Sequence, residues 1–124
     1  MRNAILAIIA LGALGVLGAL GGTLLAACQH SDVSRQVGAR CDVPADCDER
    51  CLAPSAGYPG GFCTLTCSDR SECPGDTTCA DQEGGVCLFA CTSDPDCAFL
   101  GAGWRCQAAD LRGGGIKVMV CRGG

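Results

Sequence analysis

Cysteine is the residue whose chemistry dominates this chain. The 124 residues include thirteen cysteines, a density that is rare in reducing compartments, where thiols stay reduced. A cysteine sulfur can form a disulfide, bind a soft metal as a thiolate, act as a nucleophile or carry a covalent group. The spacing of the cysteines therefore indicates which chemistry the chain uses.

Twelve of the cysteines form three sets of four with related spacing. In each set five residues separate the first cysteine from the second, and three residues separate one set from the next. The longer gaps within the sets vary. The three sets are Cys41, Cys47, Cys51 and Cys63; Cys67, Cys73, Cys79 and Cys87; and Cys91, Cys97, Cys106 and Cys121.

Other residues repeat with the cysteines. Gly61-Phe62 and Gly85-Val86 precede two of the fourth cysteines, and the residue before each second cysteine is acidic, namely Asp46, Glu72 and Asp96. Constant short gaps with variable long ones are typical of disulfide modules, because cross-link geometry is strict while surface loops tolerate insertion.

The pattern predicts three tandem modules, each closed by two disulfides. They span 41–63, 67–87 and 91–121. Four cysteines allow three pairings, and the spacing does not choose among them.

The N-terminus has the pattern of an export signal. Residues 4–27 carry no charge, which fits a signal peptide or a membrane-spanning helix in which Cys28 is incidental. The stretch ends in Leu25-Ala26-Ala27-Cys28, which resembles the lipobox of bacterial lipoproteins. That resemblance implies that 1–27 is a lipoprotein signal peptide, cleaved before Cys28, and that the Cys28 sulfur carries the lipid.

The parity of the cysteines supports the lipobox independently. Thirteen cysteines cannot all pair, but without Cys28 twelve remain, all at or beyond Cys41. We therefore expect 28–40 to be a lipidated N-terminus and flexible tether, up to about 40 Å long, followed by a cysteine-rich domain over 41–124. The resemblance implies anchoring in a bacterial cell envelope. Gln29 favours the outer membrane, with the domain facing the periplasm or the surface.

The domain itself also resembles a family. Segments 67–74 and 91–97 are similar to the cysteine-rich repeat lipoproteins of myxobacteria and, more distantly, to Dickkopf N-terminal and EGF-like modules. By analogy with such small extracellular modules, we expect the first cysteine of each set to pair with the third and the second with the fourth. The animal modules imply protein recognition, and the family implies no catalytic residue.

The composition predicts a small disulfide-rich fold of loops and short β-hairpins after the signal helix. From Cys41 onward only sixteen of 84 residues are Val, Ile, Leu, Met, Phe, Trp or Tyr, so covalent cross-links must supply much of the stability. Short strands are expected over 61–65, 85–89 and 116–121, the last forming a hairpin through Gly113-Gly114-Gly115. Little helix is expected beyond the leader.

Metal binding and catalysis are the alternatives to disulfides. Cys-x3-Cys pairs at 47/51, 63/67 and 87/91 resemble zinc knuckles, but export and the threefold repeat favour disulfides. The only histidine, His30, lies in the tether, so no activated nucleophile is identified. Acidic turn residues are interpreted as solvated side chains rather than calcium ligands; they are Asp46, Asp48, Glu49, Asp94 and Asp96. We expect neither an enzyme nor a bound metal or cofactor.

Two residues are candidates for binding a partner. Trp104 is either a recognition residue or a core residue packed on disulfides, and the second reading is favoured. Arg112 lies among glycines in 107–120, interpreted as a long loop that a protease could accept. A net charge of −4 without a basic stripe argues against nucleic acid. We expect a module for surface binding of protein or glycan, adhesion or envelope structure; the alternative is a tethered protease-inhibitor-like or toxin-like scaffold.

Replacing Cys28 with Ala should abolish lipidation and the normal cleavage of the leader, because the sulfur is the proposed acyl acceptor. Metabolic labelling with palmitate, followed by immunoprecipitation, measures this directly. Equal label in the wild type and the variant would contradict the lipobox interpretation.

Overall fold

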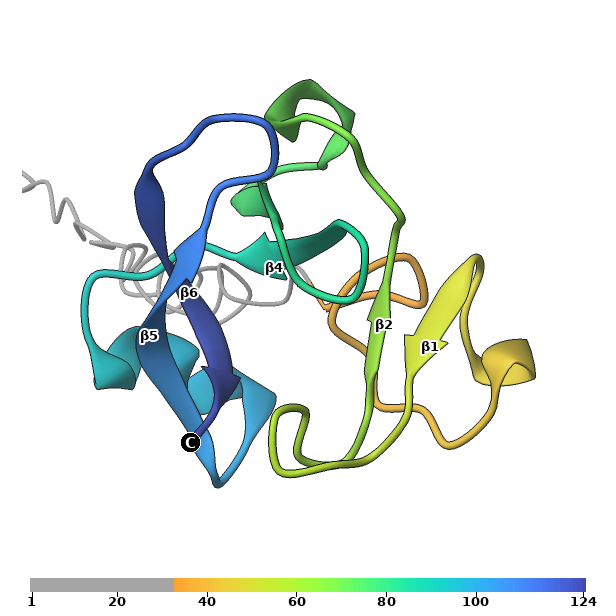
Figure 1. Ribbon diagram of the computed structural model, residues 1–124. Helices are drawn as coiled ribbons and strands as arrows, with labels where there is room; N and C mark the ends of the chain where they lie inside the picture. Colours follow the sequence, from red (N-terminus) through yellow and green to blue (C-terminus); the bar gives the residue numbers. More distant parts are fainter. Residues whose placement is uncertain (1–32) are drawn as a thin grey trace, which may run out of the picture.

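The computed structural model describes residues 33–124, which form three antiparallel hairpins, each a separate two-stranded sheet (Figure 1). The expected signal peptide, Cys28 and His30 lie outside the described residues. In chain order the elements are η2 (Pro44–Asp46), β1 (Arg50–Leu52), β2 (Phe62–Thr64), η3 (Arg70–Glu72), β3 (Thr77–Ala80), β4 (Val86–Phe89), η4 (Asp94–Leu100), β5 (Trp104–Asp110) and β6 (Lys117–Gly123).

The same plan recurs in all three modules. A 3₁₀ helix follows the first cysteine, and a hairpin of two strands follows the second. The third and fourth cysteines lie directly opposite each other on the two strands of the hairpin. These opposed pairs are Cys51 and Cys63, Cys79 and Cys87, and Cys106 and Cys121.

The opposed cysteines do not bond to each other but reach back to the preceding loop. First pairs with third and second with fourth in every set: Cys41–Cys51, Cys47–Cys63, Cys67–Cys79, Cys73–Cys87, Cys91–Cys106 and Cys97–Cys121. Their Cα–Cα distances, from 5.3 to 5.9 Å, are ordinary for disulfides. This is the pairing expected by analogy, and the small disulfide-rich fold class is confirmed.

The three expected strands are confirmed within one or two residues at their ends, as β2, β4 and β6. The interpretation of 107–120 as a long loop is wrong. Residues 107–110 pair with 117–120 in the β5–β6 hairpin, and only 111–116 form the turn. The helices among the described residues are short 3₁₀ turns. None of them is long and apolar enough to cross a membrane.

Neighbouring modules are joined by backbone pairing at equivalent positions. In the second and third modules, the residue before the first cysteine pairs with the residue before the fourth cysteine. These pairs are Thr66 with Val86 and Ala90 with Val120. The three-residue joins thus run alongside β4 and β6. In addition, the Thr64 hydroxyl donates to the Cys87 carbonyl at 2.7 Å across the first join. The disulfides stay within modules, but backbone hydrogen bonds connect the modules.

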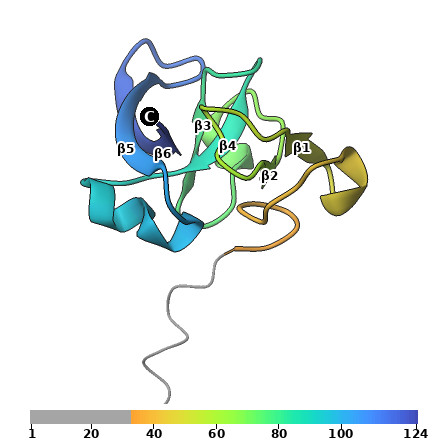
Figure 2. The ribbon, with the colours of Figure 1, turned by 90° about the horizontal axis from the view of Figure 1, so that it is seen from below.

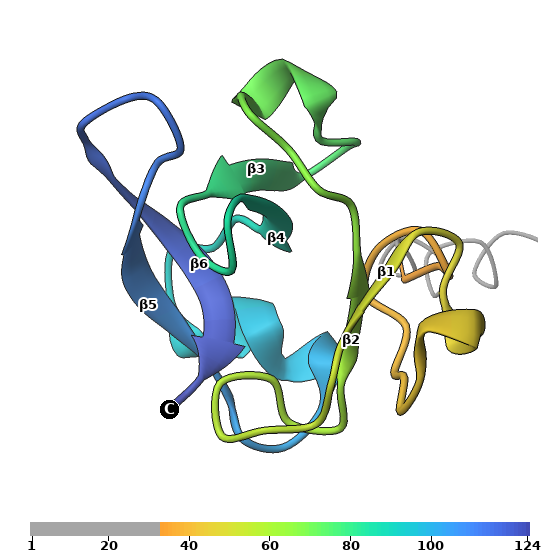
Figure 3. The ribbon, with the colours of Figure 1, turned by 45° about the vertical axis from the view of Figure 1, so that its right-hand side comes forward.

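The modules also share one hydrophobic core. A single buried cluster includes residues of all three hairpins, and β4 is buried along its whole length. Figure 3 shows β3 and β4 between the other two hairpins. The aromatic rings form a continuous row in which each ring centroid lies 5.0 to 6.5 Å from the next; its order is Tyr58, Trp104, Phe62, Phe89 and Phe99. The three modules are therefore one packed unit with three local pairs of cross-links.

The expectation of a flexible tether through residue 40 is wrong for its second half. Val37 is buried, Gly38 N donates to the Cys63 carbonyl at 2.9 Å, and Cys63 N donates to the Ala39 carbonyl at 2.8 Å. These bonds place 37–39 beside β2, where the chain enters the domain (Figure 2). Unpaired backbone groups beside a buried strand are costly, so this segment folds onto it.

Gly85 should be far less tolerant of alanine than its neighbour Gly84. Both have positive φ, but a Cβ at Gly85 would lie 2.2 Å from the Cys67 carbonyl oxygen, whereas one at Gly84 would meet nothing within 4 Å. Gly84→Ala should cost only the left-handed backbone strain of about 1 kcal/mol. Gly85→Ala should cost roughly 3 kcal/mol, because the clash adds to that strain. Denaturant unfolding of the oxidised protein measures both. Equal losses would contradict the close approach of Gly85 to the Cys67 carbonyl.

Candidate functional site

The cysteines that a metal would use are oxidised in this structure. In each module three sulfur atoms lie within 4.8 Å of one another, in the sets Cys41/Cys47/Cys51, Cys67/Cys73/Cys87 and Cys91/Cys97/Cys121. This grouping arises because the two disulfides of a module lie side by side. A zinc ligand or a cysteine nucleophile must be a thiolate, and the twelve described cysteines are all disulfide-bonded.

The acidic residue before each second cysteine has the same structural role in the three modules. Its carboxylate accepts a hydrogen bond from the backbone N–H four residues earlier, which belongs to the residue after the first cysteine. The bonds are Asp42 N to Asp46 Oδ2 at 2.9 Å, Ser68 N to Glu72 Oε2 at 2.8 Å and Thr92 N to Asp96 Oδ2 at 2.8 Å. The bond closes the loop between the two cysteines, which explains the constant gap of five residues.

These hydrogen bonds change the acidity of two of the carboxyls. Backbone donors at Asp42 and Val43 hold the pKa of Asp46 below its ordinary value of 3.8. The Thr92 hydroxyl and the backbone N–H groups of Thr92 and Ser93 lower the pKa of Asp96 from the same value. A carboxylate that accepts several hydrogen bonds is favoured in its charged form.

The remaining acidic candidates are also engaged by protein donors, apart from Glu49. Asp94 accepts from Cys106 N at 2.9 Å and pairs with Arg105 at 3.2 Å, while Asp48 pairs with Arg35 at 3.4 Å. These contacts give the acidic residues structural partners, in keeping with their interpretation as turn acids rather than calcium ligands.

Trp104 is a core residue and not an exposed recognition residue. Its side chain is 6% exposed, its ring lies 5.3 Å from that of Phe62, and its indole N–H donates to the Pro59 carbonyl at 3.1 Å. The packing alternative therefore holds for this residue. A buried tryptophan whose N–H is satisfied contributes to the fold rather than to a binding surface.

Arg112 is held against the second module. Its guanidinium pairs with Asp81 at 2.5 Å, and its backbone N–H donates to the Cys79 carbonyl at 2.9 Å. It lies in the turn between β5 and β6, so its backbone is not the extended strand that a protease cleft would take. The geometry gives Arg112 a role in docking the third hairpin onto the second.

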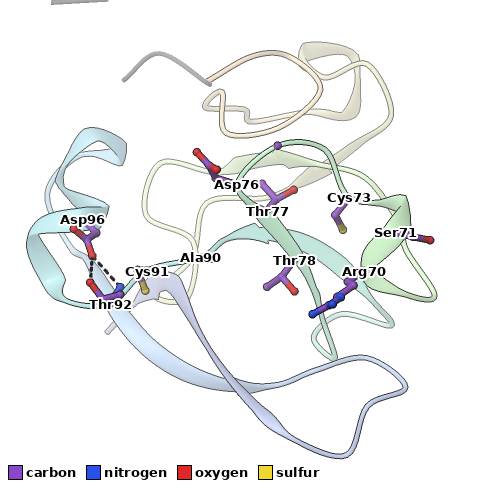
Figure 4. A pocket seen from close by; sticks show the side chains of 11 residues that line it. Arg70, Ser71, Cys73, Asp76, Thr77, Thr78, Ala90, Cys91, Thr92 and Asp96 are labelled. Carbon is purple, nitrogen blue, oxygen red and sulfur yellow. Dashed lines mark hydrogen bonds between the residues drawn. The ribbon is translucent and has the colours of Figure 1, made fainter. Parts of the chain in front are cut away.

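A large surface hollow lies between the second and third modules (Figure 4). Its volume is about 720 Å³, and its lining includes Arg70, Asp76, Thr77, Thr78 and Thr92. Asp96 also lines it, but its carboxylate is occupied by Thr92, as the dashed lines of Figure 4 show. The hollow is open, and its lining combines apolar surface with hydrogen-bonding side chains, which suits contact with another surface more than enclosure of a small molecule.

A smaller cleft lies between the first and second modules. It has a volume of about 270 Å³ and is lined by Arg50, Leu52, Ser55, Tyr58 and Glu83, with Cys51 and Ala53. No motif in the sequence predicts this cleft. Tyr58 and Glu83 do not belong to the repeated pattern, and their separation along the chain carries no motif. The one available signal was that Tyr58 is the single tyrosine of the chain.

Comparisons with known proteins identify no relative: no family model, no curated protein and no solved structure matches this chain.

Asp96→Asn should make the stability of the protein less sensitive to acid. Because the pKa of Asp96 is lowered in the folded state, its carboxylate stabilises the fold above the ordinary value of 3.8. That contribution is lost as the pH falls through the folded-state pKa. Guanidinium midpoints measured from neutral pH to below 3.8 should fall more steeply for the wild type than for the variant.

Asp76→Asn is the matched control, because the Asp76 side chain is exposed and has no hydrogen-bond partner among the described residues. Its midpoints should follow those of the wild type. Parallel pH curves for the wild type and Asp96→Asn would show that the Thr92 contacts do not stabilise the fold.

Proposed function

We propose that this chain is a lipoprotein, anchored through Cys28 in a bacterial cell envelope, whose disulfide domain is a binding module. The observation that carries the proposal is the complete pairing of the twelve described cysteines among themselves. None of them is available to Cys28. The remaining cysteine thus coincides with the position that the lipobox resemblance assigns to the lipid.

The disulfide framework supports an oxidising compartment. Six cross-links in a chain with little apolar content supply stability that the core alone would lack. In a reducing cytoplasm the sulfurs would return to thiols, and the hairpins would lose their connection to the preceding loops. Export through the proposed leader brings the chain to a compartment where these bonds persist.

The packing of 37–39 on β2 bears on how far the domain stands from the membrane. Arg35 is bonded to the first module, since its carbonyl accepts from Asp48 N at 2.9 Å and its side chain pairs with Asp48. A fully extended chain from the proposed lipidated Cys28 to Arg35 spans about 25 Å at most, against about 40 Å for a tether through residue 40. The proposed module therefore works close to the lipid surface.

The side of the domain nearest this connection carries apolar side chains. Val33 is 39% exposed and Phe99 is 41% exposed. Phe99 packs edge to face on the buried Phe89 ring at 5.0 Å, and Gly38, which is close to the Val33 backbone, lies against the same ring. Exposed apolar groups beside a lipid anchor favour an orientation with this side toward the membrane.

Binding is favoured over catalysis and over protease inhibition. The depressions on the described residues contain hydrogen-bonding groups, but the described residues include no thiol or histidine to act as nucleophile or base. Protease inhibition would require Arg112 to be presented on an extended loop, whereas it is fastened to Asp81 and to the backbone of β3.

The proposal predicts that folding depends on export. Produced with a cleavable signal peptide in place of residues 1–32, the domain should accumulate outside the cytoplasm with no thiol open to alkylation. Its mass should be about 12 Da below that of the reduced form, at two hydrogens per disulfide. Produced without a leader, it should stay alkylatable and sensitive to protease. A folded, fully reduced domain in the cytoplasm, or a stoichiometric metal on the purified protein, would contradict the proposal.

A further inference from the structure

The small cleft between the first and second modules is built by parts far apart in the sequence. Arg50 and Leu52 come from β1, Ser55 and Tyr58 from the loop that follows it, and Glu83 from the turn between β3 and β4. The end of β6 closes the far side of this loop, since Gly123 N donates to the Gly57 carbonyl at 2.8 Å. Figures 1 and 3 show the C-terminus beside this loop.

Two buried hydrogen-bonding groups at this place lack a partner. Tyr58 is 5% exposed and lines the cleft, yet its hydroxyl has no hydrogen-bond partner. The Nε atom of Arg122, the residue before Gly123 in β6, is likewise buried and unpartnered. They are the two such side-chain atoms among the described residues. Arg122 lies close enough to Tyr58 to lower its pKa through its charge and through a side-chain hydrogen bond. Even where the phenol oxygen accepts from Arg122, the phenol proton has no acceptor among the described residues, and buried polar groups are normally satisfied.

One cation and one anion line the cleft, Arg50 and Glu83, and Arg122 lies beside its Tyr58 side chain. Neither Arg50 nor Arg122 forms an ion pair with a described residue. Arg50 is instead fixed by its Nη2 atom, which donates to the Glu83 backbone carbonyl at 2.9 Å. Glu83 is the only described non-glycine residue with positive φ, at 49°. A strained turn thus presents its carbonyl to the arginine. The Glu83 carboxylate is the one negative group that lines the cleft.

The Tyr58 hydroxyl is suited to donate a hydrogen bond. Burial raises its pKa above the ordinary value of 10.0, while the charges of Arg122 and Arg50 act in the opposite direction. The hydroxyl therefore keeps its proton at neutral pH. A protonated hydroxyl and guanidinium N–H groups can all donate, and an arginine side chain cannot accept.

We propose that this cleft binds a carboxylate carried on a short carbon chain. Arginine and tyrosine donors recognise the carboxylate oxygens, and Leu52 with Ala53 provides an apolar wall for the carbon atoms. The volume of about 270 Å³ admits a small acid or a single acidic side chain. The inference rests on the proposed binding role, to which it gives a ligand class, but it does not depend on lipid anchoring.

Equilibrium dialysis of the full chain in nonionic detergent tests the proposal, with radiolabelled succinate as the free acid and a short peptide with an internal glutamate as the side-chain source. Wild-type protein should retain one or both. Tyr58→Phe, which keeps the ring on Trp104, and Arg50→Gln should each weaken binding by about tenfold or more. Arg40→Gln is the matched control, an exposed arginine that forms no ion pair with a described residue and does not line the cleft, and it should change affinity by less than about twofold.

A second measurement uses the single tyrosine, because the whole tyrosinate absorbance of the protein reports Tyr58. A bound carboxylate should raise the pKa of Tyr58 further, so added succinate should lower the tyrosinate signal at a fixed alkaline pH. Sulfate should have a smaller effect. No retention of either carboxylate, equal loss in Arg40→Gln, or sulfate bound as tightly as succinate would overturn the proposal. Cysteine alkylation of the same samples tests the oxidised fold separately, so failure of the cleft is distinguishable from failure of the proposed function.

Discussion

The structure depends on the way the two disulfides of each module cross. The third and fourth cysteines face each other across a hairpin, but each is bonded to the loop before the hairpin. Both strands are thereby held against one short segment. A bond between the facing cysteines would join strands already paired by their backbones. Bonding to the preceding loop instead orders a segment that has few apolar contacts of its own.

The repeated features of the sequence serve this arrangement. The acidic residue before each second cysteine closes the loop that carries the first two cysteines, and Gly61 and Gly85 let a carbonyl of the preceding loop approach the strand. Each of these repeated positions has a structural role. The repeat is therefore a structural requirement, and function has to be sought in residues that it does not include.

The candidate carboxylate cleft fits that expectation. Tyr58 and Glu83 have no counterparts at equivalent positions of the other modules, whereas Arg50 corresponds to Arg105, since each directly precedes a third cysteine. The residues that line the cleft come from the first two modules and meet because the hairpins pack on one core. Rigid cross-linked strands and tight turns can hold donors in place with little loss of entropy on binding. The cross-links therefore allow a small domain with few apolar residues to keep the Tyr58 hydroxyl buried without an acceptor for its proton.

The sequence by itself determined the covalent plan: which cysteines belong together, where three strands lie and that the fold is small and disulfide-rich. Those features are local, since a disulfide module constrains spacing over a few tens of residues. The tertiary structure alone decided that 37–39 fold onto β2, that 107–120 is mostly hairpin, that Trp104 is buried and that Arg112 is fastened to Asp81. It also brought Tyr58 beside Arg50 and Glu83. These outcomes depend on contacts between modules. Side chains that pack across modules do not recur at a regular spacing in the sequence, so no periodic pattern predicts them.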